Sequence, residues 1–272
     1  MAKKSPVGRL ALSLKEKQFI TPNFIRIILT GEGLEAFEET TVGDNNKIFI
    51  PPAGVNKIHF PDFDYEKHQW IYPPKEVAPS IRTYTHRGLD LEKKELTIDF
   101  VNHGDGGPAS AWALNAKIGD ILGVAMRTSG SELYPEADFY LLAGDATAIP
   151  VLSAILETLP ETARGIAIIE VATKEDEQNL VTKASIEIQW LHNAHPENGS
   201  ALAAKVKQVS ILENDTKFGY VAAEFSSVKE IRNYLRKEKS WTKEELYAYS
   251  YWKSGVAEDK SVSDRQEEKN SI

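Results

Sequence analysis

The chain has 272 residues, a formal net charge of −8 and no cysteine. This length accommodates two domains with separate cores, and without cysteine any redox chemistry must come from a bound cofactor. The acidic balance argues against general nucleic-acid affinity, no apolar run is long enough to span a bilayer, and residues 1–6 lead into no signal segment. We therefore expect a cytoplasmic monomer that neither binds nucleic acid nor inserts into a membrane.

Short strands separated by turn signals dominate the first half of the chain. We expect them at residues 9–14, 25–30, 47–50, 81–85, 96–101 and 121–124. Many short strands with a single helix predict a β-barrel. We place this first domain at residues 1–135.

The strand at 81–85 carries an unusual set of polar side chains. Alternation along a strand puts Arg82, Tyr84 and His86 on one face and Thr83, Thr85 and Arg87 on the other. A guanidinium fork suits a pyrophosphate, and an aromatic ring packs on a flat ligand such as a flavin. An ordinary amphipathic strand shows the same alternation, so this segment alone leaves both interpretations open.

A glycine-rich loop follows the strand at 96–101 and ends at Pro108, which is suited to begin a helix. The free N–H groups of a helix start attract anions. Small residues in the first turn, Ala109 and Ser110, would let a pyrophosphate approach the backbone. A glycine loop without a ligand is the alternative.

From residue 138 onward the pattern changes to alternating strands and helices. Strands are expected at 139–143, 165–172, 186–191 and 220–223, with a helix at 149–159. This order predicts a parallel α/β sheet, which we place at residues 136–257. The capping-box patterns Ser227/Glu230 and Thr242/Glu245 predict two further helix starts.

The turn after the first of these strands contains no Gly-x-Gly-x-x-Gly, which leaves nicotinamide binding open. We expect Thr147 to be a helix N-cap and Pro150 to lie in the first turn. His192 and His195 have no evident third ligand, so no metal site is predicted. The polar segment 258–272 has little to bury and is expected to be a mobile tail or a solvated helix.

Six ordered motifs resemble those of the siderophore-interacting proteins, which are flavin-containing ferric-siderophore reductases. The resemblance covers roughly residues 7 to 256. The motifs are Arg82-x-Tyr84-Thr85-x-Arg87, Asp99-Phe100-Val101-x-His103-Gly104, Gly107-Pro108-Ala109-Ser110-x-Trp112-Ala113, and the segments 141–150, 218–224 and 249–255.

This resemblance implies a two-domain α+β protein, with an N-terminal antiparallel β-barrel that binds FAD and a Rossmann-like α/β domain similar to NAD(P)H-binding domains. It implies that FAD passes electrons from NAD(P)H or reduced ferredoxin to a ferric siderophore, a hydroxamate or a catecholate, and so releases Fe(II). The implied FAD contacts are Arg82, Thr83, Tyr84, Thr85, Asp99, Val101, His103, Gly107, Ala109, Ser110, Asp145, Thr147, Ala148 and Trp252.

Matching the motifs also implies substrate contacts at Lys47, Arg127 and Lys253, because negatively charged ferric siderophores require a locally basic pocket. No protein residue beyond the flavin is expected to be catalytic. The chain departs from the family pattern at Ala125-Met126, where Gly-Pro is usual, and at Ala223, where glycine is usual.

Two alternative functions fit the same residues. A general flavin-dependent ferredoxin or NAD(P)H reductase would keep the architecture without a preference for iron chelates. A non-catalytic siderophore-binding protein would bind the ligand without a flavin.

Overall fold

The computed structural model describes residues 7–212 and 215–270. The chain divides into two compact units, Met1–Ser131 and Glu132–Ile272. The domain boundary at residue 135 stays a prediction. The predicted start of the first domain, residues 1–6, and the end of the predicted tail, residues 271–272, lie outside the described residues.

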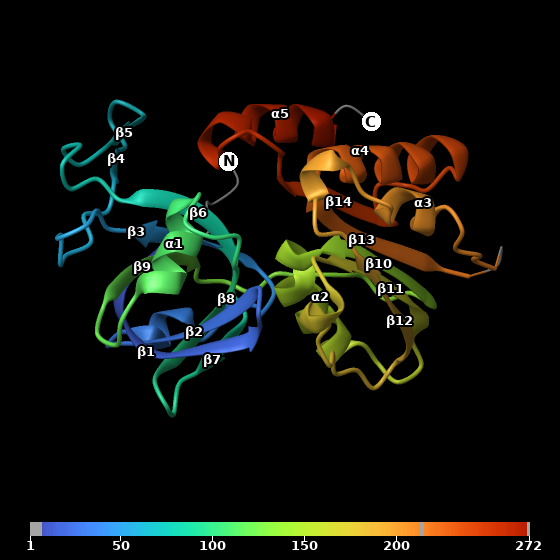
Figure 1. Ribbon diagram of the computed structural model, residues 1–272, viewed down its shortest axis with the longest axis horizontal. Coiled ribbons are helices and arrows are strands. Elements are labelled where there is room, and N and C mark those ends of the chain that lie inside the picture. The colour runs from blue at the N-terminus through green and yellow to red at the C-terminus, as the bar shows by residue number, and fades with distance from the viewer. Residues whose placement is uncertain (1–6, 213–214, 271–272) are drawn as a thin grey trace. The chain divides into compact units, whose positions relative to one another are not determined.

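The first unit is built on an antiparallel sheet (Figure 1), which within the described residues has seven strands in the order β6-β3-β9-β1-β2-β8-β7. These are β1 Val7–Thr21, β2 Phe24–Thr30, β3 Asn45–Ile50, β6 Ser80–Thr85, β7 Gly88–Asp90, β8 Glu95–Val101 and β9 Ile121–Arg127. A separate hairpin is formed by β4 Asp62–Asp64 and β5 Gln69–Ile71, and the helix α1 spans Pro108–Asn115. The helix therefore begins at Pro108, as predicted.

The sheet curves back on itself, so that β6 approaches β8 from the far end of the strand order. The Arg87 N–H donates to the Thr97 carbonyl at 3.0 Å, and the Tyr84 and Phe100 rings lie 4.4 Å apart. Alternate side chains from five strands fill the concave face with buried apolar residues such as Leu12, Ile27 and Ile48. The result is a half-barrel with its own core.

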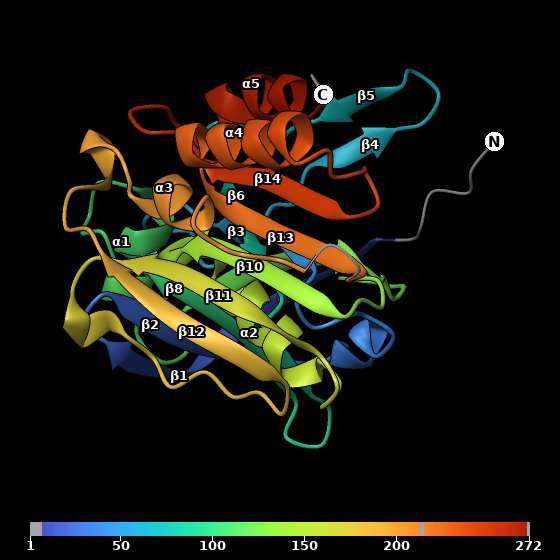
Figure 2. The same ribbon diagram turned by 90° about the vertical axis from the view of Figure 1, so that its right-hand side faces the viewer.

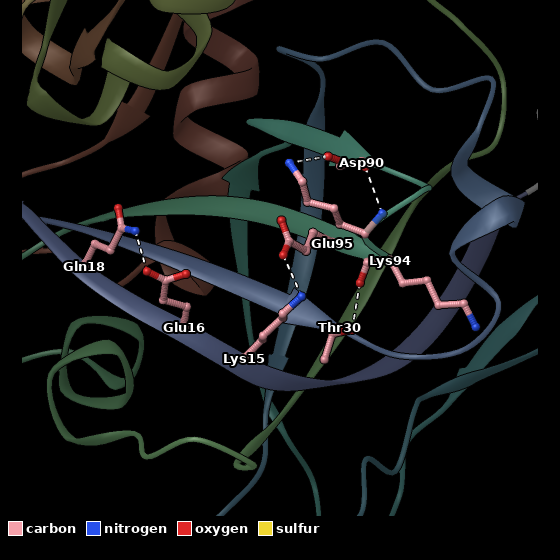
Figure 3. Close-up of polar contacts among 8 residues, drawn as sticks. Lys15, Glu16, Gln18, Thr30, Asp90, Lys94 and Glu95 are labelled. Carbon is pink, nitrogen blue, oxygen red and sulfur yellow. Dashed lines mark hydrogen bonds and ion pairs between the residues drawn. The ribbon is translucent and has the colours of Figure 1, made fainter.

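The convex face of β1, β2 and β8 carries charged and polar side chains instead (Figure 3). Lys15 pairs with Glu95 across strands at 2.7 Å, and the Thr30 hydroxyl donates to the Lys94 carbonyl. Lys94 has a positive φ of 52° in the turn between β7 and β8. This alternation of apolar and polar faces is what confines the core to one side of the sheet.

The second unit is a parallel sheet, with five strands in its described part in the order β12-β11-β10-β13-β14 (Figure 2). The strands are β10 Phe139–Asp145, β11 Arg164–Val171, β12 Ser185–His192, β13 Lys217–Glu224 and β14 Leu246–Trp252. The helices are α2 Ile149–Thr158, α3 Leu202–Val206, α4 Phe225–Asn233 and α5 Glu258–Asn270. Counted from β10, the order is 3-2-1-4-5, the order of a Rossmann sheet.

Helices lie on both faces of this sheet, with α2 on one and α3 and α4 on the other (Figure 1). The α3 and α4 side buries a continuous core that includes Ile168, Val221 and Ile231. Because helices cover both faces of the sheet, β10 and β13 are buried almost throughout. Strands buried in this way have nearly continuous apolar sequences.

Both capping-box predictions were wrong. Helix α4 begins at Phe225, because the Glu224 carboxylate at the end of β13 accepts from the Ser226 N–H, so Ser227 lies inside the helix. Glu245 does accept from the Thr242 N–H at 2.7 Å, but the residues that follow form β14 rather than a helix.

Thr147 is not a helix N-cap either. A 3₁₀ turn at Ala146–Ala148 precedes α2, and Asp145 caps it by accepting from the Thr147 N–H. Pro150 does lie in the first turn of α2, as predicted.

The polar segment after residue 258 is helical, the second of the two expected alternatives. Helix α5 nonetheless buries Ser261 and Arg265, at 0% and 4% exposure, although its sequence offered little to bury. Arg265 donates to the carbonyls of Ser250 and Tyr251 on β14. The helix is thus fixed to the edge strand of the sheet by a polar contact.

Candidate flavin and substrate site

Strand β6 holds the first group of predicted site residues and pairs with β3, with Arg82 opposite Ile48 and Tyr84 opposite Asn46. Facing residues of antiparallel strands share a face, so both side chains lie on the concave side with the core. The Arg82 guanidinium donates to the adjacent Ile81 carbonyl at 2.7 Å, and the side chain is half-buried. Its remaining donors suit an anionic group.

One buried polar side chain near this strand lacks any hydrogen-bond partner among the described residues. Asn46 is 1% exposed, and neither its amide oxygen nor its amide nitrogen has a hydrogen-bond partner. A buried unpaired amide costs free energy unless a ligand satisfies it. A polar ligand beside Tyr84 would satisfy Asn46, so these residues fit a cofactor with hydrogen-bonding ring edges.

His86 is fully buried, and burial lowers the pKa of its imidazole to about 4. Its Nε2 lies 3.2 Å from the Thr40 hydroxyl oxygen, and that hydroxyl donates to the Phe37 carbonyl. Thr40 therefore accepts from Nε2–H, which leaves Nδ1 as a buried acceptor without a partner in the described chain. The ring is neutral at physiological pH.

Asp99 is paired with an arginine of the neighbouring strand. Its carboxylate receives two hydrogen bonds of 2.8 Å from Arg26 on β2, and the Arg87 Nε lies 3.8 Å away. Asp99 is 4% exposed, so this pair fastens β2 to β8 at the position where the two residues face each other. A role for Asp99 toward FAD stays a prediction, and Val101 is half-buried at the end of the same strand.

The loop between β8 and α1 is braced by Ser110. The Ser110 side chain is fully buried, and its oxygen accepts from the His103 N–H at 3.1 Å. A Cβ on Gly107 would lie 3.1 Å from His103 Cε1, so glycine permits this close path. Ala109 is buried and His103 is exposed. The small residues thus shape the loop, and their contact with a phosphate stays a prediction.

The convex side of β3, β6 and β9 carries two of the predicted substrate cations. Lys47 lies opposite Thr83 on one side and Ala125 on the other, and its Nζ donates to the Thr83 hydroxyl. Arg127 is exposed and lies two residues beyond Ala125, on the same face. Thr85 is buried at the end of β6. The strand order therefore brings Lys47, Thr83 and Arg127 to one face.

In the second unit, Asp145 joins the carboxyl ends of three strands. Its Oδ1 accepts from the Thr147 N–H and hydroxyl, and its Oδ2 accepts from the Glu224 N–H at 2.9 Å and Trp252 Nε1 at 2.7 Å. Burial raises the pKa of the Asp145 carboxyl, while these donors oppose that rise. The structure thus brings Asp145, Thr147 and Trp252 together, around a side chain whose acceptor positions are occupied.

Close packing at this turn depends on glycine. A Cβ on Gly144 would lie 2.8 Å from the Ala222 carbonyl oxygen. The buried Ala148 completes the turn. The carboxyl ends of β10 and β13 are the position where the strand order reverses, which is where open α/β sheets bind nucleotides.

Lys253 follows β14 and makes two contacts. Its Nζ lies 2.5 Å from the Asp264 carboxylate of α5 and 4.8 Å from the centroid of the Phe225 ring. The predicted substrate lysine is thus neutralised by a residue of the C-terminal helix. No signal in the sequence marked Asp264, because a carboxylate in a polar segment is ordinary.

His192 and His195 bond separately to Glu177 and Glu197, at 2.8 and 3.2 Å. Within residues 7–212 and 215–270 no group of three metal-ligating side chains is found. Over the same residues no helix is long and apolar enough to cross a membrane.

An antiparallel half-barrel is followed by a parallel sheet in the Rossmann order, and together with the matches that follow this makes the chain a flavin-dependent oxidoreductase. The predicted fold class is confirmed. The siderophore-interacting FAD-binding domain family matches residues 13–127, and the siderophore-interacting protein family matches residues 137–255.

Named relatives agree with this class. The chain is 33% identical to ferric vibriobactin reductase ViuB of Vibrio cholerae over 249 residues, covering 91% of this chain and 90% of the relative. It is 32% identical to the NADPH-dependent ferric-chelate reductase of Escherichia coli, covering 89% and 91%. The crystal structure of the siderophore-interacting protein SipS from Aeromonas hydrophila superposes with a TM-score of 0.81 at 29% identity, covering 95% of this chain and 97% of that one. This chain belongs to the siderophore-interacting protein family.

Proposed function

We propose that this protein is a ferric-siderophore reductase that holds FAD on its half-barrel and takes electrons from a reduced nicotinamide. The observation that carries the proposal is the concave face of β6, where Arg82 and Tyr84 lie beside the buried, unpartnered amide of Asn46. The family match and the similarity to two proteins named as ferric reductases support it.

FAD supplies the link between a two-electron hydride donor and ferric iron, which accepts one electron. Arg82 would bind the pyrophosphate through its free donors, and Tyr84, held against Phe100, would pack along the ring. Asn46, which lies opposite Tyr84, would offer hydrogen bonds to polar ring atoms. The proposed contact of Thr85, whose side chain is on the other face of β6, rests on the family resemblance alone. The proposed contacts of Asp145, Thr147, Ala148 and Trp252 with FAD rest on the family resemblance alone.

The substrate side of the proposal rests on charge. Lys47 and Arg127 share the convex face of the first unit, and Lys253 belongs to the second unit. Such cations would attract an anionic ferric chelate. Reduction then weakens the complex, because hard anionic oxygens hold Fe(III) better than Fe(II), so the protein need supply no acid or nucleophile to the metal.

NADPH is the electron donor we favour, because the Escherichia coli relative is named for it and the β10–β13 switch point suits a nucleotide. Reduced ferredoxin is the alternative donor. A cytoplasmic location, where NADPH is available as a reductant, and a monomeric state complete the proposal.

Anaerobic spectroscopy tests the proposal. The purified protein is titrated with NADPH, NADH or reduced ferredoxin, and then with a ferric siderophore in the presence of an Fe(II) trap. Bleaching of the flavin band followed by its return, with trapped Fe(II), is the expected result. A protein that cannot be loaded with FAD would refute the assignment. A flavin that is reduced but ignores ferric chelates would indicate a general reductase.

A further inference from the structure

A cavity of about 520 Å³ lies within the second unit at the amino ends of β13 and β14. Phe218 and Leu246, which line it, lie at the beginning of these strands. Glu224 and Trp252 lie at the carboxyl ends of the same strands. In a parallel sheet all amino ends share one edge. The cavity is therefore at the opposite edge from Asp145, and its volume is that of a small-molecule site.

Three cations line this cavity: Arg232, Arg236 and Lys243. Among its described lining residues Glu132 is the one acid. Arg236 Nη1 donates to the Trp241 carbonyl at 3.1 Å, while its Nε is buried and has no hydrogen-bond partner in the described chain. A backbone carbonyl orients the guanidinium without neutralising its charge. The cavity is thus lined by a guanidinium that the Trp241 carbonyl holds in one orientation.

The second chemical feature of the cavity is aromatic. Tyr247 stacks on Tyr220 with ring centroids 4.5 Å apart, and the Tyr134 hydroxyl donates to the Thr158 hydroxyl at 3.0 Å. Both lining tyrosines are therefore held in place by contacts outside the cavity. Rings fixed in this way offer flat apolar surface at low entropic cost.

We propose that this cavity is a separate binding site for a small aromatic anion. The phosphate or carboxylate of the ligand would pair with Arg236 and Lys243, and its ring would pack on Tyr134 and Tyr247. Arg and Lys bind both anionic groups through charge-assisted hydrogen bonds. Because the cavity lies at the opposite edge of the sheet from Asp145, the proposed flavin and nucleotide contacts do not use it.

Calorimetric titration of the FAD-loaded full chain tests the proposal with three probes: phenyl phosphate, benzoate and inorganic phosphate. One aromatic anion should bind more tightly than inorganic phosphate, and the better of phenyl phosphate and benzoate identifies the anionic group. Saturating NADP⁺ should leave this binding intact. Equal binding of inorganic phosphate, displacement by NADP⁺, or no binding of either aromatic probe would overturn the proposal.

Substitutions of the lining cations test whether the ligand binds in this cavity. Arg236→Gln should weaken binding roughly tenfold or more, the usual effect of losing a charge-assisted hydrogen bond. Lys237→Gln is the matched control, because Lys237 is the next residue, is exposed, and does not line the cavity. Lys243→Gln removes an exposed charge without threatening the fold and should weaken binding several-fold. Wild-type affinity in both Arg236→Gln and Lys243→Gln would exclude this site.

Discussion

Removing the charge of Asp264 should raise the affinity of the enzyme for anionic ferric siderophores. Lys253 is the proposed substrate cation of the second unit, and its Nζ lies 2.5 Å from the Asp264 carboxylate. An anionic substrate must therefore compete with Asp264 for this lysine. Asp264→Asn keeps the size of the side chain and removes the competing charge.

The size of the effect follows from solvent exposure. The lysine side chain is 30% exposed and the aspartate 47%, so water screens the pair. Pairs of this kind contribute about 0.2–1 kcal/mol. The expected gain in affinity is therefore roughly 1.5- to fivefold. Helix α5 should stay in place, because Arg265 holds it to β14 independently of Asp264.

The assay is the KM for two ferric chelates under the same donor concentration, one anionic and one electrically neutral. Asp264→Asn should lower the KM for the anionic chelate and leave that for the neutral chelate unchanged. Glu267→Gln, an equal charge change at an exposed position of the same helix, is the control. Equal effects of the two variants would show only a net-charge effect, and an unchanged KM in Asp264→Asn would refute the competition for Lys253.

Three further predictions concern buried polar groups. The pKa of His86 is about 4 in the folded protein and near 6.5 when exposed, so between these values the unfolded chain binds more protons than the folded chain. The free energy of unfolding should therefore fall by about 3 kcal/mol as the pH drops from 6.5 to 4. Denaturant titrations should show a shallower pH dependence in His86→Gln; an unchanged slope would contradict this. Asn46→Leu should stabilise the FAD-free protein by about 1–2 kcal/mol and reduce its retained flavin absorbance, whereas undiminished flavin would separate Asn46 from the cofactor. Asp145→Asn should lower the free energy of unfolding by about 2–4 kcal/mol, because an amide nitrogen would then face hydrogen-bond donors. The substitution should also alter the fluorescence of Trp252. A stability equal to that of the wild type would refute the proposal that Asp145 is the shared acceptor.

Elements with strong patterns were predictable from the sequence. Strand β10 and helix α2 read as an apolar run followed by a proline in the first helical turn, and both were found within two residues of their predicted ends. Strand β14 was not predicted, because the spacing of Thr242 and Glu245 is typical of a helix start. In the structure the Thr242 N–H does donate to the Glu245 carboxylate, but the pair lies in a turn before the strand. The strands β4, β5 and β7 have three residues each, too few to show an alternation.

The candidate site was predictable only where its residues are neighbours in sequence. Arg82 and Tyr84 stand out because they alternate on one short strand. Asn46 gave no signal, since a single polar residue in a strand is common and its burial depends on strand pairing. The Arg26–Asp99 pair joins residues 73 positions apart, a contact that register sets and local pattern does not.

The arginines beside β14 have a consequence for the behaviour of the protein in a crowded solution. This strand ends the sheet order, and an uncovered edge would offer its carbonyls to a strand from another molecule. Arg232 occupies the Ala248 carbonyl and Arg265 those of Ser250 and Tyr251. Helix α4 supplies Arg232 and helix α5 supplies Arg265, so a chain that ends before residue 258 would keep the first contact and lose the second. The carbonyls of Ser250 and Tyr251 would then be open to pairing with a strand of another molecule.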